Sequence, residues 1–256
     1  MRLFKAVWRV SVEEFFIYRA TSFFTFFLAA IFFVVELLAG HIFFAASGSV
    51  NGWDGQSYQL LIATVSSVVY LYNIFFIVGH ENLSEDILEG NLDYTLIRPV
   101  SSYWFTSMAQ IDVPSIFNFV ISLVVVGVSL KQLSFTAVGV VLYVFAALLA
   151  FGLFFILNKA VVTVTFWVDG FTALGGIMED SIDLLSRPAG IFPRILRFIF
   201  MFIVPVLLVT NLPVLSLKLT VSSYWHFAYI VLFEVVLYLL SRWLWNKGIR
   251  RYFSAN

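Results

Sequence analysis

The sequence predicts an all-α integral membrane protein that crosses the bilayer six times and forms one transmembrane domain, residues 1–256. Of these 256 residues, 61% are hydrophobic and only 12% are charged, and the mean hydropathy is +0.97. A water-soluble surface needs far more charge than this. The apolar residues form long continuous runs rather than the alternating pattern of a membrane β-barrel, which favours helices.

Six apolar runs approach the length of a membrane span. A helix rises about 1.5 Å per residue, so a hydrocarbon core of about 30 Å requires about 20 apolar residues. A further stretch, 160–178, is not counted because Asp169 lies in its middle and glycines weaken it. The expected spans are residues 21–39, 58–78, 113–130, 133–157, 198–217 and 221–240.

The positions of the basic residues predict the orientation. With six spans, every lysine and arginine except Lys131 and Lys218 falls on the side of the two chain termini. Lys159 is among those assigned to this side, in the loop after the fourth span. Because cytoplasmic loops are enriched in Lys and Arg, both termini are expected in the cytoplasm.

Residues 1–19 are expected to form an amphipathic helix in the inner headgroup layer. Aromatic residues such as Phe4 and Trp8 are interspersed there with basic residues such as Lys5 and Arg9. This pattern is typical of helices that lie in the membrane interface. A frayed basic leader that only sets the topology is the alternative.

The loop of residues 81–100 is expected to contain a short helix that binds a partner. Ser84 is placed to cap the helix N-terminus, and Gly90 is placed to end the helix in the left-handed conformation. A helix of one and a half turns is marginal on its own. The alternative is a solvated acidic loop without a partner. The loop contains more aliphatic residues than such a free loop would. A second segment, 166–193, combines acidic and aliphatic residues and is expected to form the other half of a docking surface.

The sequence contains little that predicts catalysis. No phosphate-binding GxxxxGK[ST] motif is present, and the three histidines lie far apart. The cluster of Asp169, Asp180 and Asp183 resembles a fragment of the CDP-alcohol phosphotransferase signature, but its spacing departs from that signature and Leu174 stands in place of the arginine. A solvated acidic helix explains these aspartates better. A zero formal net charge gives no indication of nucleic-acid binding.

Polar residues inside the expected spans are candidates for a translocation pathway, because they are costly in a bilayer. Glu36 falls toward the outer end of the first span, and Glu234 falls near the middle of the sixth. Asn118, in the third, is a milder candidate.

Six spans, an N-terminal interfacial helix and a short helix between spans two and three together resemble the type-2 export permeases of ATP-binding-cassette (ABC) transporters. The run Leu88-Glu-Gly-Asn-Leu-Asp93, followed by Leu96-Ile-Arg-Pro-Val100, is similar to a motif of one bacterial branch of these ABC-2 family permeases. The runs Ser186-Arg-Pro and Phe202-Ile-Val-Pro205 fit the same branch.

The resemblance implies a permease subunit of the bacterial plasma membrane that binds no cofactor itself. A separate ATP-binding subunit would hold ATP and Mg²⁺, and a second copy or a related permease would complete the transporter. The subunit would export a hydrophobic or amphipathic substrate. The residues of the implied coupling helix and of its link to the third span are Glu85, Asp86, Ile87, Leu88, Glu89, Gly90, Leu92, Asp93, Arg98 and Pro99.

Two other classes of function remain open at this point. A membrane-embedded phosphotransferase would use Asp169, Asp180 and Asp183 and turn over by itself with a divalent metal. A membrane scaffold or immunity protein would show no dependence on ATP.

Overall fold

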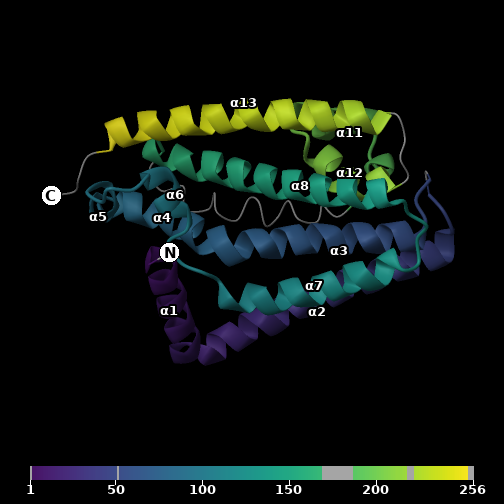
Figure 1. Cartoon of the computed structure of the whole chain (residues 1–256), viewed down its shortest axis with the longest axis horizontal. Coiled ribbons are helices and arrows are strands. Elements are labelled where there is room, and N and C mark those ends of the chain that lie inside the picture. Colours follow the sequence, from purple (N-terminus) through teal and green to yellow (C-terminus); the bar gives the residue numbers. More distant parts are fainter. Residues whose placement is uncertain (1, 51, 169–186, 218–221, 253–256) are drawn as a thin grey trace.

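The structure is a computed structural model of the whole chain, and it describes residues 2–50, 52–168, 187–217 and 222–252. Throughout these residues the regular secondary structure is helical, apart from one isolated bridge between Val50 and Trp53. The all-α prediction is therefore confirmed. Figure 1 shows the long helices side by side along the longest axis of the molecule.

The chain begins with two helices that meet at a sharp corner. Helix α1 (Arg2–Ile17) is separated from α2 (Arg19–Ser47) by Tyr18, whose backbone leaves the helical conformation at φ −99° and ψ 34°. Figure 1 shows α1 turned away from the direction of α2. The separate N-terminal helix is confirmed, while its place in the headgroup layer stays a prediction.

The central element is an unbroken helical run from Gly55 to Leu88. It comprises α3 (Gly55–Tyr72), the π-helical turn η1 (Asn73–Ile77) and α4 (Val78–Leu88). The side chain of Asp54 caps its start by accepting a hydrogen bond from the Ser57 N–H at 2.8 Å. Helix α3 packs against α2, α7 and α8, so it lies in the middle of the bundle.

Two short helices follow before the chain re-enters the bundle. They are α5 (Asp93–Leu96) and α6 (Ser102–Ser107). The long helices α7 (Val113–Leu130) and α8 (Ala137–Thr163) come next, and α8 continues into the 3₁₀ turn η2 (Val164–Phe166). Helix α8 lies between α3 and the last helix, α13 (Ser222–Arg251).

The stretch expected as the fifth span is broken instead of straight. It forms α11 (Arg194–Phe198) with the π-helical turn η5 (Ile199–Ile203), and then α12 (Val206–Leu217), and the two parts are bent by 86°. The prediction of one continuous span over 198–217 is wrong in this respect. The cause is Pro205, which lacks an N–H and forces the preceding residue out of the helical conformation; Val204 has φ −124° and ψ 84°.

The number of spans agrees with the prediction when this bent pair is counted as one. Five helices are long and apolar enough to cross a membrane, and the pair makes up to six. The first and last of them are longer than expected. Helix α2 continues past residue 39 to Ser47, and α13 continues past residue 240 to Arg251, because no proline stands near either expected end and Gly40 is accommodated inside α2.

The described part of the segment 166–193 is divided between two places. Phe166 packs edge-on against Trp245 near the end of α13. Residues 187–193 lie elsewhere, because buried Asn211 of α12 accepts a hydrogen bond from the Ala189 N–H at 3.0 Å and donates one to the Arg187 carbonyl at 3.2 Å. These hydrogen bonds tie residues 187–193 to α12, and a docking role for the segment 166–193 stays a prediction. Residues 169–186 lie outside the described residues.

Replacing Asn211 with Ala is expected to destabilise the protein. The change removes four amide hydrogen bonds in a fully buried position, to Arg187, Ala189, the Leu207 carbonyl and the Thr210 hydroxyl. Each buried group left unpaired costs about 1–3 kcal/mol, so the melting temperature in detergent should fall by roughly 4–8 °C. Asn91→Ala is the control, because Asn91 is exposed. Equal melting temperatures for both variants would show that Asn211 does not hold this segment.

Candidate functional site

The exposed end of α4 and the following loop form a surface of acidic and apolar side chains, here called the docking surface. It consists of Glu85, Leu88, Glu89, Tyr94 and Ile97, and Ile97 is 81% exposed. Gly90 has φ +80°, so the prediction of a left-handed residue at this helix end is confirmed. Tyr94 is 69% exposed and was not among the predicted docking residues. Its position as an aromatic residue beside an acidic run could have indicated a place on this surface.

The helix that carries this surface begins earlier than predicted. Ser84 does not cap a helix but lies inside α4, buried, with its hydroxyl 3.1 Å from the hydroxyl of Thr165. The prediction of an N-cap is wrong because no helix-breaking residue separates α3 from α4, so the helix continues through position 84. Glu85 and Leu88 of the docking surface therefore lie on a direct continuation of the central helix.

The other residues expected to dock on a partner hold the loop in place. Leu92 is completely buried in the core and cannot contact a partner. Asp86, Ile87 and Asp93 are half-buried. Arg98 and Pro99 are exposed. The Arg98 guanidinium lies over the Phe105 ring at 4.8 Å, so this residue ties the loop to α6.

Helix α6 lies directly behind the docking surface and contacts α4 very closely. A Cβ added at Gly79 of α4 would lie 2.5 Å from the carbonyl oxygen of Thr106, so only glycine permits this approach. Next to it, Nε2 of buried His80 is 3.1 Å from the Ser107 hydroxyl, and Nδ1 is 2.7 Å from the Tyr72 hydroxyl. Helices α4 and α6 therefore form one packed unit.

A second set of contacts joins α6 to α8. The Lys159 ammonium donates a hydrogen bond to the Thr106 hydroxyl at 2.8 Å and lies 4.1 Å from the centre of the Trp245 ring. Trp104 stacks on Phe155 with ring centres 4.9 Å apart. Lys159 is completely buried in α8, so its predicted place in a cytoplasmic loop is wrong. The error arises because a lysine side chain normally lies exposed to water, whereas here the ammonium contacts aromatic rings and one hydroxyl.

A third set joins α6 to α13. The Tyr103 hydroxyl is 3.0 Å from the Ser241 hydroxyl, and the Trp245 indole N–H donates to the Ser102 hydroxyl at 3.2 Å. The C-terminal end of α13 lies near α5 (Figure 1). Just beyond α13, burial and then the nearby Asp93 carboxylate raise the pKa of Tyr252. The contacts of α6 with α4, α8 and α13 are here called the α6 junction.

A comparison with protein families supports a transport function. A family profile described as ABC-2 family transporter protein matches residues 15–256. The chain belongs to the ABC-2 transporter family. It is thus a multi-pass permease subunit, as the resemblance implied. Neither the curated proteins nor the solved structures that were searched contain a match.

The structure of the permease does not bring the three expected pathway residues together. Asn118 of α7 is buried, and its amide N–H donates to the Phe26 carbonyl of α2 at 3.5 Å. Glu36 lies half-buried on α2. Glu234 lies half-buried on α13, with one carboxylate oxygen 3.0 Å from where a Cβ at Gly152 would stand. Helix α13 packs on α8 and α12, whereas α2 packs on α3 and α7, so these residues lie on different sides of the bundle.

The described part of the permease contains no candidate metal centre. Its residues include no cluster of three or more His, Asp or Glu side chains that could hold a metal ion. The phosphotransferase hypothesis depends on three aspartates that lie outside the described residues, namely Asp169, Asp180 and Asp183.

Proposed function

We propose that this permease exports a hydrophobic or amphipathic substrate with energy from a separate ATP-binding subunit that binds the docking surface. That subunit holds the ATP and Mg²⁺, and this chain binds no cofactor. The observation that carries the proposal is the α6 junction. It lies directly behind the docking surface and joins α4 to α8 and α13.

The contacts of α6 give this proposal a mechanism. A subunit that pushes on Glu85 moves α4, and the close contact at Gly79 transmits a movement of α4 toward α6. Helix α6 is in turn bonded to Lys159 and Ser241. The push therefore reaches two long helices, and packed interfaces switch between discrete arrangements rather than deform continuously.

Two copies of the permease, or this chain and a related permease, form the pathway between them in this proposal. A single bundle is closed in its middle, where Thr64, Ala150 and Thr210 line a space too small for a substrate. The two outer helices, α2 and α13, bury little of their apolar surface within one chain. The permease lies in a bacterial plasma membrane in this proposal, with both termini on the cytoplasmic side, which is the orientation that the distribution of Lys and Arg favours.

Charged substitutions on the docking surface are expected to weaken binding of the ATP-binding subunit. Ile97→Asp removes the most exposed apolar side chain there and adds a charge next to an acidic rim. A central apolar contact of an interface is worth about 2 kcal/mol or more, which corresponds to about a 30-fold weaker complex. Leu88→Asp should act in the same direction. Binding is measured by pull-down of the ATP-binding subunit in mild detergent.

Ile97→Val is the matched control, because it keeps an apolar side chain at the same position. ATP-driven substrate export by proteoliposomes that contain both subunits separates a transporter from a scaffold or immunity protein. If the Ile97→Asp variant binds the ATP-binding subunit as tightly as the Ile97→Val variant, the docking surface is assigned wrongly. If export does not depend on ATP, the proposed function fails as a whole.

A further inference from the structure

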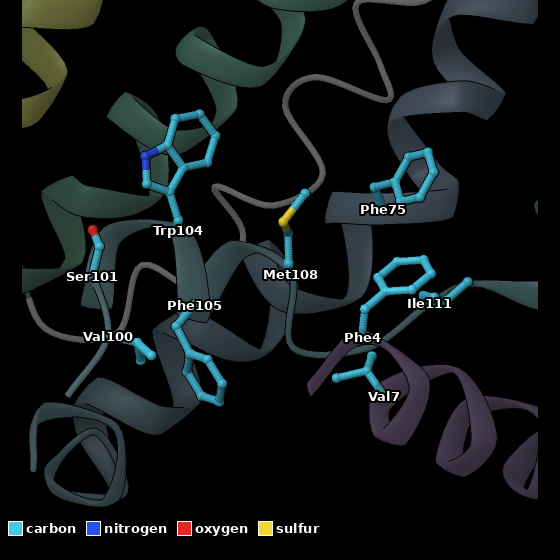
Figure 2. Close-up of a pocket in the computed structure, with 9 residues that line it drawn as sticks. All are labelled: Phe4, Val7, Phe75, Val100, Ser101, Trp104, Phe105, Met108 and Ile111. Carbon is cyan, nitrogen blue, oxygen red and sulfur yellow. The ribbon is translucent and has the colours of Figure 1, made fainter. Parts of the chain in front are cut away.

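An apolar groove lies between the N-terminal half of α1 and the rest of the bundle. Its first part is a cavity of about 230 Å³, with Phe4 and Val7 of α1 on one side and residues 100–108 on the other (Figure 2). A second cavity of about 620 Å³ adjoins it and shares Phe4, Phe75 and Ile111 with the first. Because three residues line both cavities, the two lie next to each other, and together they are here called the groove.

Among the described residues, the hydrogen bonds between α1 and the linker before α7 come from the C-terminal half of α1. The Ser11 hydroxyl accepts a hydrogen bond from the Ile111 N–H at 2.9 Å, and the Gln110 amide donates to the Glu14 carboxylate. On the N-terminal half, Phe4 and Trp8 are about half exposed although both line the groove. The groove is therefore a slot beneath a helix that is anchored at one end.

The charge at the groove selects its occupant. Lys5 lines the second cavity and is exposed. Across the described ranges of the chain, Arg9 and Glu13 form the one ion pair, with 2.8 Å between Nε and Oε1, so the Lys5 ammonium has no carboxylate within salt-bridge distance. The remaining lining is almost entirely apolar. A slot for an alkyl chain with one unpaired cation matches a lipid with an acyl tail and a negatively charged headgroup.

From this geometry we infer that the groove binds one anionic phospholipid, with an acyl chain in the slot and its phosphate on Lys5. Trp8 lies beside the phosphate, at the headgroup level that tryptophan prefers. Trp104 and Phe105 of α6, and Met108 directly after it, line the same groove, so the lipid contacts the α6 junction from the side of α1. The acyl chain fills the space between α1 and α6 and thereby sets the distance between these two helices. This site is separate from the docking surface and does not depend on the ATP-binding subunit.

The inference is tested on the full chain alone, purified in mild detergent. The chain is incubated with equal amounts of palmitoyl-oleoyl phosphatidylglycerol and phosphatidylcholine, and native mass spectrometry counts the lipids that stay bound. One retained phosphatidylglycerol per chain is expected, in clear excess over phosphatidylcholine. Lys5→Gln should lower the ratio of the two retained lipids about fivefold, the effect of about one basic contact with an anionic lipid. Lys131→Gln, an exposed lysine at the other end of α7, should leave the ratio unchanged.

A second variant tests the slot itself. Val7→Trp fills the groove and should abolish retention of both lipids, whereas Val10→Trp, at an exposed position that lines neither cavity, should not. Equal retention of the two lipids by the unmodified chain, or an unchanged ratio in Lys5→Gln, would overturn the inference. Retention that survives Val7→Trp would place the lipid elsewhere and overturn it as well. Because no ATP-binding subunit is present, these outcomes do not depend on the proposed function.

Discussion

The substitution Gly79→Ala is expected to lower both the stability of the permease and its ATP-driven transport. The added Cβ would lie 2.5 Å from the Thr106 carbonyl oxygen and 2.6 Å from that of Ser107. Both atoms belong to the backbone and cannot rotate away, so α6 must move off α4. Overpacking of this kind costs about 1–3 kcal/mol, and the melting temperature should fall by roughly 3–9 °C.

The loss of transport follows from the same displacement. When α6 moves, the bond between His80 and Ser107 lengthens, and a push on the docking surface no longer reaches α8 and α13. The control is Gly127→Ala in α7, where a Cβ would meet nothing within 4 Å. That variant should keep full transport and gain up to about 1 kcal/mol, because alanine favours a helix more than glycine does. A Gly79→Ala permease that transports at the normal rate would show that the contact of α4 with α6 carries no motion.

The substitution Lys159→Met is expected to act on stability and transport in opposite directions. The ammonium is completely buried, and within the described residues no carboxylate lies within salt-bridge distance of it. Replacing a buried charge with an apolar side chain of similar volume often stabilises a protein, by about 1–4 kcal/mol. Thr106 does not lose its only partner, because its hydroxyl also donates to the Ser102 carbonyl at 2.9 Å. The melting temperature should rise by roughly 3–8 °C.

Transport should decline in the same variant, because methionine cannot make the hydrogen bond that joins α8 to Thr106. Lys247→Met is the control. Lys247 also lies over an aromatic ring, that of Trp243 at 4.0 Å, but it is exposed, so its replacement should change the stability by less than about 0.5 kcal/mol. A lower melting temperature for Lys159→Met would mean that the buried cation has a stabilising partner and is not a cost to the fold.

The sequence predicted those features that depend on local chemistry. Long apolar runs define the helices whatever their neighbours are, and Gly90 was identified as a left-handed helix end because few other residues adopt that conformation. Glu85, Leu88 and Glu89 were correctly expected to be accessible, since they follow a span and precede a turn. A binding function for this surface stays a prediction.

The features that were missed depend on contacts between distant parts of the chain. Lys159 is buried because Thr106 and Trp245, far away in the sequence, happen to receive its ammonium. Leu92 is an aliphatic residue in the loop and was therefore expected to contact a partner, but it packs into the core. Pro205 was visible in the sequence, and its effect depends on position: Pro213 lies inside α12 without a comparable bend. Only tertiary packing decides between such outcomes.

The π-helical turn η1 determines which side of α4 faces which neighbour. A π turn holds one residue more than an α turn, so every side chain after Ile77 is rotated by about 100° compared with an uninterrupted helix. With this phase, His80 and Ser84 point at Ser107 and Thr165, and Glu85 points outward. If the extra residue moved to another turn of the helix, the acidic face of α4 would turn about the helix axis while the helix stayed continuous. The position of η1 therefore sets the direction in which this acidic face points.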